Sequence, residues 1–404
     1  MDRADWIDLA RLALDEFGTP FYLFSYPPVE ERVAKLEKAI EQAKVATAVQ
    51  QLLSLKTLPV PHLIQEWCKR GRGVEVVSET ELSAALRAGV PNTHIVVNGV
   101  GKHHWLDAYT ETGLTVNFDS LSEVRSLLPW AIERGWRLGL RVAVSPQIDP
   151  DCPDQPAQFG MSETDMKAAV RYVRSQSGDI QTLHFHLHSN VKDVSKFRVA
   201  LDECYQLAQY LSIEPRFVDI GGGLPDFDVL QRNQGRVGPE FLPEYAQFLA
   251  DASRRFVHLD ALWIENGRYL LGPAGILVVS VIDTKWIRGR RFIICDGGRT
   301  NHAIESDWEY HAMIPVRETS GGYVPSTVCG PNCMAYDWVY KGLLPEEIRE
   351  KDQLLYLNAG AYHLPWETRF SRGLCRVLWS PDGKTIKEIR AEESLEAVQA
   401  IWRL

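Results

Sequence analysis

Short apolar runs rich in β-branched residues alternate with amphipathic helical stretches through the first two thirds of the chain. Eight of these runs are expected to be strands, namely 46–55, 74–78, 94–98, 114–119, 138–144, 180–186, 216–220 and 262–265. Between them, segments such as 79–88 carry apolar residues at helical spacing and follow capping residues such as Ser78. Alternating strands and helices predict parallel βαβ units, and eight strands are the number that closes a (β/α)8 barrel. A doubly wound open sheet stays the alternative, because a count of strands does not distinguish the two folds.

A different pattern begins after residue 272. Runs at 276–282, 292–295, 354–357 and 377–379 are expected to be strands, separated by Gly, Pro and Asn with few helices between them. A length of 404 residues also exceeds one core of usual size. We therefore predict a barrel domain over residues 27–272 and a mostly β second domain. The run Phe21–Phe24 precedes the first helix of the barrel, so the β domain is expected to combine residues 1–26 and 273–404.

Charge and cysteine content limit the partners and the compartment. Lys and Arg number 44 against 53 Asp and Glu, which gives a net charge of −9 and disfavours nucleic acid and anionic membranes as partners. The longest apolar run, near Gly275–Ile282, is far shorter than the roughly 20 residues that span a bilayer. Acidic residues among the first five do not fit a secretory signal. Seven scattered cysteines, an odd number, argue against a disulfide framework and for a reducing, cytoplasmic compartment.

Two groups of residues have the chemistry of metal ligands, but their spacing does not predict a metal site. Cys329 and Cys333 are four residues apart, and no second Cys or His pair follows at the spacing of a zinc site. His184, His186 and His188 share one face of a strand. Strand geometry spreads three such residues over roughly 13 Å, which is too far to bind one ion. We expect one histidine to lie flat on a cofactor ring and the other two to be buried and hydrogen-bonded.

Polar residues stand where several barrel strands are expected to end, which is where barrel active sites form. Lys56 directly follows an apolar strand. Apolar walls would lower the pKa of this lysine and favour its condensation with an aldehyde; a lysine that extends to solvent is the alternative. The run Gly221–Gly223 lets backbone N–H groups approach a phosphate closely, although a flexible turn has the same composition.

Glu265 and Arg268 follow the last predicted strand of the barrel. A carboxylate at position 265 that faces the nitrogen of a pyridine ring would keep this nitrogen protonated, so that the ring can accept an electron pair. Arg268 could bind a phosphate through two parallel hydrogen bonds. The alternatives are an ion pair between these two side chains and a salt bridge of Arg268 at the surface.

In this order the residues resemble the fold-type III pyridoxal-phosphate enzymes, the group of diaminopimelate, ornithine and arginine decarboxylases. The resemblance covers nearly the whole chain. Its motifs are Gly18–Tyr22, Lys56, Gly73–Leu82, Arg141 with Phe159–Met161, His184–His186, Gly221–Gly223, Glu265–Arg268, Gly330–Cys333 and Gly360–Tyr362. It implies an alanine racemase-like (β/α)8 barrel, a following β domain, pyridoxal 5′-phosphate as the cofactor and a homodimer with shared active sites.

The resemblance also implies a role for each matching residue. Lys56 corresponds to the lysine that binds the cofactor covalently, His186 to the histidine that stacks on its ring, and Glu265 to the carboxylate at its pyridine nitrogen. Cys333 corresponds to a cysteine of the partner subunit that returns a proton after carbon dioxide leaves. Lys56 is the alternative proton donor, and a buried interface thiol is the alternative role of Cys333. The other cofactor-binding residues implied in this way are Glu75, Arg141, Ser189, Gly221, Gly222, Gly223, Gly267, Arg268 and Tyr362.

The departures from the family pattern concern the substrate. Family members that bind diamino acids carry an acidic residue directly after the cysteine, whereas this chain has Met334, and an unpaired ammonium beside a thioether is disfavoured. Arg299, Arg369 and Arg372 lie in the matching loops. We therefore expect decarboxylation of a larger or acid-bearing amino acid, such as a citrate-linked diamino acid in siderophore biosynthesis. The His-Ser-Asn variant at 188–190 resembles that branch.

Three alternative functions stay open at this point. The first is decarboxylation of diaminopimelate or another basic amino acid. The second is amino acid racemisation, which Glu265 disfavours because racemases of this architecture place an arginine at the ring nitrogen. The third is a non-catalytic homologue that acts as a binding protein, which the presence of Lys56, the glycine run and Arg268 disfavours.

Overall fold

The computed structural model describes residues 1–148, 157–231, 237–256, 258–301 and 308–403. The chain forms two compact units. The barrel unit consists of Val33–Pro225 and Val237–Gly267, and the β unit consists of Met1–Arg32, Asp226–Arg236 and Arg268–Leu404. The predicted boundaries, after residues 26 and 272, lie a few residues away from these. The assignment of Asp226–Arg236 to the β unit is not expected from the sequence.

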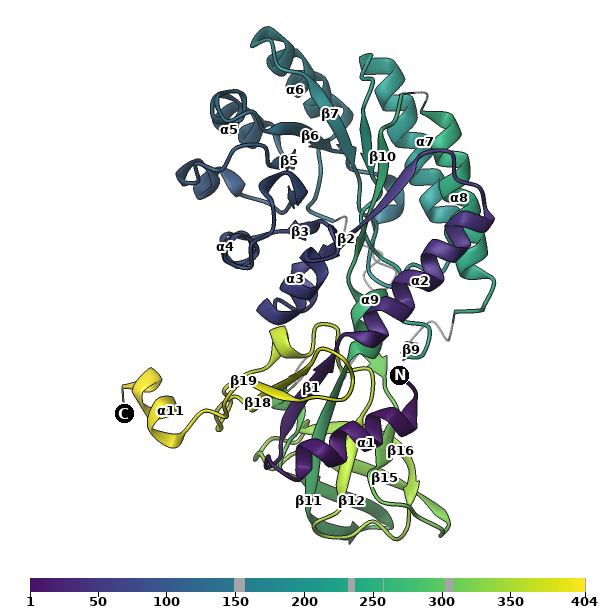
Figure 1. Cartoon of the computed structure of the whole chain (residues 1–404), viewed down its shortest axis with the longest axis vertical. Helices are drawn as coiled ribbons and strands as arrows, with labels where there is room; N and C mark the ends of the chain where they lie inside the picture. Colours follow the sequence, from purple (N-terminus) through teal and green to yellow (C-terminus); the bar gives the residue numbers. More distant parts are fainter. Residues whose placement is uncertain (149–156, 232–236, 257, 302–307, 404) are drawn as a thin grey trace. The chain divides into compact units, whose positions relative to one another are not determined.

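The barrel unit is a closed barrel of eight parallel strands, in the order β10-β2-β3-β4-β5-β6-β7-β8 (Figure 1). Strand β10 pairs with β8 on one side and with β2 on the other. The barrel prediction is therefore confirmed, and the closed ring of pairs excludes the open sheet. The barrel strands are β2 (Ala48–Ser54), β3 (Val74–Val76), β4 (Ile95–Val97), β5 (Thr115–Phe118), β6 (Arg137–Arg141), β7 (Ile180–His184), β8 (Phe217–Asp219) and β10 (Ala261–Asn266).

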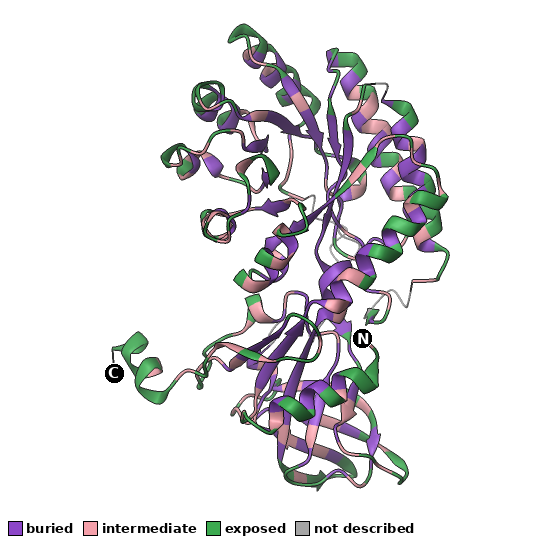
Figure 2. Cartoon of the chain, viewed as in Figure 1, coloured by how far each residue is buried: buried purple, intermediate pink, exposed green. Residues whose placement is uncertain are grey.

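Helices surround the barrel strands, and Figure 2 shows buried strands inside and exposed outer helix faces. The helices are α2 (Pro27–Gln42), α3 (Pro61–Cys68), α4 (Glu79–Arg87), α5 (Leu121–Glu133), α6 (Glu163–Ser175), α7 (Val194–Leu211) and α8 (Phe241–Arg255). They begin where the sequence offers caps: Ser78 at the start of α4 accepts a hydrogen bond of 3.3 Å from the Glu81 N–H. This arrangement leaves the carboxyl ends of the strands as the place where functional side chains converge.

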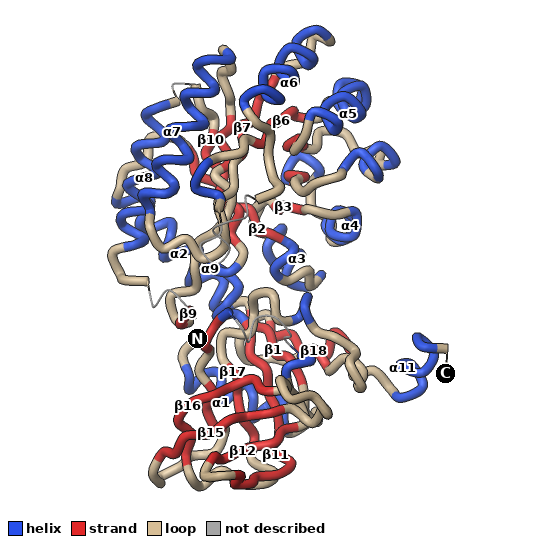
Figure 3. Tube along the Cα trace, turned by 180° about the vertical axis from the view of Figure 1, so that it is seen from behind, coloured by secondary structure: helices blue, strands red, loops and turns tan. Residues whose placement is uncertain are grey.

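The β unit is built on a nine-stranded sheet in which β1 lies between β11 and β18 (Figure 3). β1 pairs with β11 in antiparallel and with β18 in parallel orientation, so the N-terminal strand is an interior strand of this sheet. The sheet strands are β1 (Phe21–Ser25), β11 (Gly275–Ile287), β12 (Arg290–Cys295), β14 (Met313–Pro315), β15 (Tyr323–Cys329), β16 (Trp338–Pro345), β17 (Gln353–Tyr356), β18 (Arg376–Ser380) and β19 (Lys387–Arg390). β9 (Leu230–Gln231) and β13 (Glu309–Tyr310) form a separate antiparallel pair.

Helix α1 (Arg3–Leu14) packs on this sheet, and the patterns described above do not include it. Its N-cap Asp2 accepts hydrogen bonds from the backbone N–H groups of the first turn. Trp6 and Leu9 of α1 belong to one buried cluster together with Phe21 and Ile276 of the sheet, so apolar burial anchors the helix. The β unit also contains α9 (Arg268–Leu271) and α11 (Leu395–Trp402).

Two further findings concern the described part of the chain as a whole. The free cysteines are Cys68, Cys204, Cys295, Cys329, Cys333 and Cys375, and Cys152 lies outside the described residues. In the segments that the structure describes, no helix combines the length and the apolar character needed to cross a membrane.

Candidate active site

A pocket of about 320 Å³ opens at the carboxyl ends of the barrel strands. Lys56, Glu75, Arg141, His186 and Glu265, all predicted from the sequence, line this pocket. The other lining residues are Val77, Asn98, Gly99, Val100, Phe159 and His184. Because parallel strands end on the same side of a barrel, residues that are far apart in the sequence converge here.

Lys56 lies in a short 3-10 turn, Leu55–Thr57, directly after β2. Its Nζ atom is 3.0 and 3.3 Å from the two carboxylate oxygens of Glu75, a side chain that is almost fully buried. Ser54 Oγ donates a further hydrogen bond of 2.5 Å to Glu75. The amine therefore faces a carboxylate, and not only the apolar walls expected from the sequence. This charge-assisted contact holds the amine in the pocket.

Glu265, near the end of β10, is buried among hydrogen-bond donors. Asn98 Nδ2 donates to its Oε1, and the His184 Nε2 and His186 Nδ1 atoms lie 3.2 and 3.6 Å from its carboxylate oxygens. Burial alone would raise the pKa of Glu265, but His184, His186 and Lys56 together hold this pKa well below its ordinary value. Glu265 is therefore a buried carboxylate, suited to binding the protonated nitrogen of a heterocycle.

Two further buried groups, Asp219 and His184, lie against Glu265. Potential ligand atoms of all three side chains lie within 4.8 Å of one another. Burial, reinforced by the Glu265 carboxylate, raises the pKa of Asp219 well above its ordinary value, whereas burial lowers the pKa of His184 to about 4. These shifts favour a protonated carboxyl group at Asp219, a carboxylate at Glu265 and a neutral imidazole at His184. The sequence analysis missed Asp219, although an aspartate inside the apolar run 216–220 is a signal that identifies a buried polar group.

The run Gly221–Gly223 follows β8 and passes close to neighbouring backbone. A Cβ atom on Gly221 would lie 2.6 Å from the Phe185 carbonyl oxygen, and one on Gly223 would lie 2.7 Å from that of His188. The φ values of these two glycines are 70° and 100°, which also favour glycine. The Gly221 N–H donates to Asp219 and the Gly222 N–H donates to His186 Nδ1, each at 3.0 Å. The glycine backbone thus orients both side chains.

Arg141, Ser189 and Gly267 are the remaining predicted residues of the barrel unit. Arg141 forms an ion pair of 3.3 Å with Asp119, and its guanidinium carbon lies 4.6 Å from the centroid of the Phe159 ring. Ser189 is exposed after β7. Gly267 follows β10 at a position where a Cβ atom would collide with a neighbouring threonine side chain.

The β unit holds Arg268 and Tyr362. Arg268 Nη1 lies 2.8 Å from Glu309 Oε1, and both side chains are almost fully buried. The Arg268 guanidinium carbon lies 4.7 Å from the centroid of the Tyr362 ring. Glu309 Oε2 in turn lies 3.2 Å from His311 Nε2. Glu309, which the sequence analysis missed, is therefore a buried partner that orients Arg268.

Cys333 is exposed in the loop 330–337 of the β unit. Asp337 holds this loop together, because its Oδ2 accepts a hydrogen bond of 2.8 Å from the Asn332 N–H and its carbonyl oxygen accepts one from the Gly330 N–H. Cys333 and Arg372 line one pocket of about 420 Å³. The thiol and one predicted arginine thus share a concave surface.

The other predicted substrate residues have different surroundings. Met334 is half-buried beside Cys333. Arg369 binds both carboxylate oxygens of Glu393 at 2.8 to 3.1 Å. The Arg299 guanidinium carbon lies 5.6 Å from the centroid of the Trp338 ring. Among these described arginines, Arg372 is the one that lines the pocket with the thiol.

The family described as “Pyridoxal-dependent decarboxylase, pyridoxal binding domain” matches residues 28–272, more than half of the chain. The chain belongs to the pyridoxal-dependent decarboxylases. A diaminopimelate decarboxylase of Aquifex aeolicus is 28% identical over 407 residues, which cover 97% of this decarboxylase and 93% of that protein. An L-glutamyl-[BtrI acyl-carrier protein] decarboxylase of Niallia circulans is 28% identical over 377 residues, which cover 86% of this decarboxylase and 85% of that protein.

Solved structures share the fold of this decarboxylase. A diaminopimelate decarboxylase from Helicobacter pylori, complexed with L-lysine, superimposes with a TM-score of 0.84 at 23% identity and covers 98% of this chain and 99% of its own. The family resemblance found in the sequence is confirmed. The comparisons also confirm the predicted carboxy-lyase reaction and the predicted dependence on pyridoxal 5′-phosphate.

The pocket at the barrel end fits pyridoxal 5′-phosphate. Lys56 offers a primary amine for the aldehyde of the cofactor, and Glu265 offers a buried carboxylate for its ring nitrogen. Arg141 lines the same pocket, and its Nε is buried without a hydrogen-bond partner among the described residues. An anionic group of the cofactor can use such a donor. The donor set of this decarboxylase therefore matches the cofactor of its family.

Proposed function

We propose that this decarboxylase acts on a larger or acid-bearing amino acid, such as a citrate-linked diamino acid in siderophore biosynthesis. Met334 follows Cys333 at the position where an acidic residue would bind a distal ammonium, and a thioether offers no charge for one. Arg372 lines the pocket of Cys333 and forms no ion pair with any described residue. Because Glu393 already neutralises Arg369, Arg372 is the arginine on which the substrate proposal depends. A substrate carboxylate is the natural partner for such a guanidinium.

The names of the relatives support two substrate classes. Several relatives are diaminopimelate decarboxylases, so diaminopimelate is the second candidate substrate. One relative acts, by its name, on an L-glutamyl group of an acyl-carrier protein, which is a conjugated amino acid. That relative supports a substrate in which the reacting amino acid is joined to a larger group.

In the proposed mechanism, Lys56 would hold the cofactor covalently, His186 would lie against its ring and Glu265 would keep a negative charge at its ring nitrogen. Bound pyridoxal phosphate supplies an electron-accepting ring for the electron pair that departing carbon dioxide leaves behind. Cys333 of a second copy of the chain, or Lys56, moves a proton to the substrate carbon. Glu75 orients the Lys56 amine. The proposed cofactor-binding residues are completed by Arg141, Ser189, Gly221, Gly222, Gly223, Gly267, Arg268 and Tyr362.

Lys56, which lies beside Glu75 in the barrel pocket, carries the proposed mechanism, and its replacement is the decisive experiment. Lys56→Ala should abolish borohydride-trapped attachment of the cofactor and lower kcat/KM at least about 1000-fold, because no other amine replaces the covalent link. Mass spectrometry and the absorbance of the cofactor measure these changes. Lys167→Ala removes an exposed lysine of α6 and is the matched control, which should leave both unchanged. Persistent attachment in Lys56→Ala would contradict the mechanism.

The substrate is tested by carbon dioxide release from a panel of compounds. The panel contains diaminopimelate, ornithine, lysine and citrate conjugates of short diamino acids. We expect kcat/KM for a conjugate to exceed that for each free diamino acid at least about 100-fold, the factor that about 2.7 kcal/mol of differential binding gives. Turnover of free diaminopimelate at a comparable rate would favour the second candidate.

A homodimer with shared active sites is also proposed. The exposed position of Cys333, in a loop that Asp337 holds together, supports its contribution to a neighbouring copy. Mixing inactive Lys56→Ala chains with inactive Cys333→Ala chains should restore part of the activity if each site takes residues from two copies. Failure of two folded, mixed variants to restore activity would contradict the shared site.

Two other functions make different predictions for the same preparation. A racemase would change the chirality of its amino acid without releasing carbon dioxide, and Glu265 at the ring nitrogen disfavours it. A non-catalytic binding protein would be colourless and inert with added cofactor, whereas the proposed enzyme is yellow and bleached by borohydride. The cytoplasmic location expected from the cysteines stays a prediction.

A further inference from the structure

Two side-chain amides, Asn98 and Asn117, are buried inside the barrel, and no step of the mechanism above uses them. Asn98 directly follows β4 and lines the pocket of Lys56, whereas Asn117 belongs to β5 and is not among the described lining residues of that pocket. Both belong to the barrel unit. A buried amide needs partners for its nitrogen and for its oxygen, so its contacts indicate which groups it orients.

The amide nitrogen of Asn98 donates to two carboxylates. One hydrogen bond goes to Glu265 Oε1, and a longer one, of 3.4 Å, goes to Glu75 Oε1. An amide nitrogen carries two hydrogens, so both contacts form at the same time. Glu75 is the carboxylate that binds Lys56 Nζ, and Glu265 is the proposed partner of the ring nitrogen. Asn98 therefore links the two ends of the proposed cofactor site.

Asn117 determines which way the Asn98 amide points. Asn117 Nδ2 donates a hydrogen bond of 2.9 Å to Asn98 Oδ1 and one of 3.3 Å to Asp219 Oδ2. If the Asn98 amide turned by 180°, its oxygen would face the two carboxylates and its nitrogen would face the Asn117 donor. Both contacts would be repulsive, so the amide has one favoured orientation. The amide network consists of Asn98, Asn117, Glu75, Asp219 and Glu265.

The neighbouring strand β6 leaves space for Asn117 at Gly139. Asn117 and Gly139 are paired residues of β5 and β6. A Cβ atom on Gly139 would collide with Asn117 Oδ1 and would lie 3.0 Å from the Cβ atom of Thr182. Glycine inside a strand weakens the strand and often marks a close approach of another group. The side chain of Asn117 is the group that approaches here, so the barrel is built around this amide.

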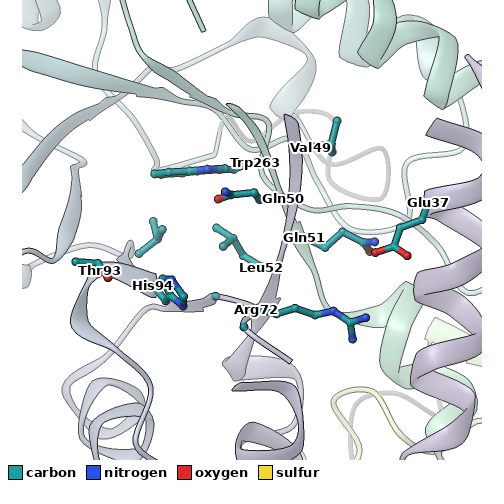
Figure 4. A pocket seen from close by; sticks show the side chains of 12 residues that line it. Glu37, Val49, Gln50, Gln51, Leu52, Arg72, Thr93, His94 and Trp263 are labelled. Atoms are coloured by element: carbon teal, nitrogen blue, oxygen red, sulfur yellow. The ribbon is translucent and has the colours of Figure 1, made fainter. Parts of the chain in front are cut away.

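Apolar side chains lie one layer deeper in the barrel than the amide network. Residues two positions apart on a strand point to the same side, and Phe217 and Trp263 precede Asp219 and Glu265 by two positions. The buried apolar cluster consists of Leu52, Val96, Phe217, Ala261 and Trp263. Leu52 and Trp263 also line a separate pocket of about 220 Å³ (Figure 4), whose described lining contains no member of the amide network. In such apolar surroundings a hydrogen bond to a charge is stronger than in water.

We propose that Asn98 is a positioning residue that holds the Glu265 carboxylate for the ring nitrogen, and that Asn117 keeps Asn98 in this orientation. The inference rests on the cofactor site proposed above. The hydrogen bond from Asn98 stabilises the negative charge of Glu265. Without this bond, a proton between Glu265 and a ring nitrogen stays more on Glu265, and the ring accepts an electron pair less well. The amide therefore acts on the chemical step more than on substrate binding.

Asn98→Leu, which keeps a similar volume and removes both donors, tests the proposal in the holoenzyme. Nitrogen-15 NMR of the enzyme loaded with ring-labelled pyridoxal phosphate measures whether the ring nitrogen carries a proton. We expect the signal of the variant to move toward the position of an unprotonated pyridine. We also expect kcat to fall at least about tenfold, the factor lost with one hydrogen bond to a charged group, while KM changes less than about threefold. The substrate is the one that the panel above identifies.

Further variants separate the role of the amides from packing. Asn117→Leu frees Asn98 to rotate and should move the NMR signal in the same direction, with kcat lowered about threefold. Thr182→Val is the matched control, because Thr182 is buried beside Gly139 and its hydroxyl has no hydrogen-bond partner among the described residues. It should leave the signal, kcat and KM unchanged. If Asn98→Leu does not fold, Asn98→Ala, which enlarges the pocket that Asn98 lines, takes its place with the same expected changes.

Several outcomes would overturn the proposal. An unchanged NMR signal in a folded Asn98 variant would show that this amide does not act through Glu265. A higher KM at constant kcat would assign Asn98 to substrate binding instead. Equal changes in Thr182→Val would reduce the amides to packing. If the wild type does not attach the cofactor at Lys56, the proposed cofactor site fails together with this inference, whereas an unchanged signal in the loaded variant overturns this inference alone.

Discussion

The carboxyl groups of Asp219 and Glu265 lie within 4.8 Å of each other inside the barrel, although both side chains are almost completely buried. Ionisation of both carboxyl groups at this distance is disfavoured in a buried site. Burial and the Glu265 charge raise the pKa of Asp219, while His184, His186 and Lys56 keep Glu265 ionised against the effect of burial. These shifts favour a proton on Asp219 and a negative charge on Glu265.

Asp219→Asn should change how stability depends on pH. The folded-state pKa of Asp219 is raised above its unfolded value, so its contribution to stability is present at low pH and is lost as the pH rises through the raised pKa. Each unit between the two pKa values corresponds to about 1.4 kcal/mol. We therefore expect the free energy of unfolding of the variant, relative to that of the wild type, to increase by at least about 1 kcal/mol as the pH rises from 5 to 8.

Urea unfolding of the cofactor-free protein at several pH values measures this difference. Asp202→Asn, which changes a half-exposed carboxylate of α7, is the control and should follow the wild-type profile. A profile of Asp219→Asn that runs parallel to that of the wild type would mean that Asp219 is ionised in the folded state.

His184→Gln should make the protein more tolerant of acid. Burial lowers the pKa of His184 from 6.5 to about 4, so the unfolded chain takes up a proton in this range while the folded chain does not. The wild type therefore loses stability as the pH falls from 6.5 to 4, by roughly 3 kcal/mol from this group. The free energy of unfolding of the variant, measured with denaturant at pH 7 and at pH 4.5, should therefore fall less between these two pH values than that of the wild type. An unchanged slope would show that His184 titrates normally.

Glu309→Gln should destabilise the β unit and disturb Arg268. Removing one partner of a buried ion pair typically costs about 3 to 5 kcal/mol. The Arg268–Glu309 pair has side-chain exposures of 6% and 2%, whereas Arg376 and Glu388 form a more exposed pair. Glu388→Gln is therefore the control, expected to cost less than about 1 kcal/mol. Thermal unfolding of both variants provides the comparison, and equal losses would refute the special role of Glu309.

The barrel could be predicted because its strands are buried on both faces and appear as continuous apolar runs. The ends of the strands were less certain. The run 180–186 was expected to be one strand, but β7 ends at His184, where the chain turns and His186 Nδ1 meets the Gly222 N–H. Such an end depends on a contact with a distant residue, and the local pattern does not contain it.

The site residues also fall into two groups, those that the sequence pattern identifies and those that only the fold identifies. Lys56 and Glu265 were predictable because their residue types recur in a fixed order along the family pattern. Asp219 and Glu309 were not, because their importance comes from burial and from partners that are far away in the sequence. The sequence suggested that three arginines bind the substrate. The fold shows that the Glu393 carboxylate already neutralises Arg369, a contact that the sequence does not reveal.

Met334→Asp should shift the substrate preference toward free diamino acids, if the proposed function is correct. An aspartate directly after Cys333 would pair with a distal ammonium, whereas the native thioether leaves that charge unpaired. We expect kcat/KM for ornithine or diaminopimelate to rise at least about tenfold, equivalent to about 1.4 kcal/mol. The value for an acid-bearing conjugate should fall, because the new carboxylate repels it. Ala335→Asp places the same charge on the next, exposed residue and should change neither value. If both variants behave alike, position 334 does not contact the substrate side chain, and the preference must come from Arg372 or another group.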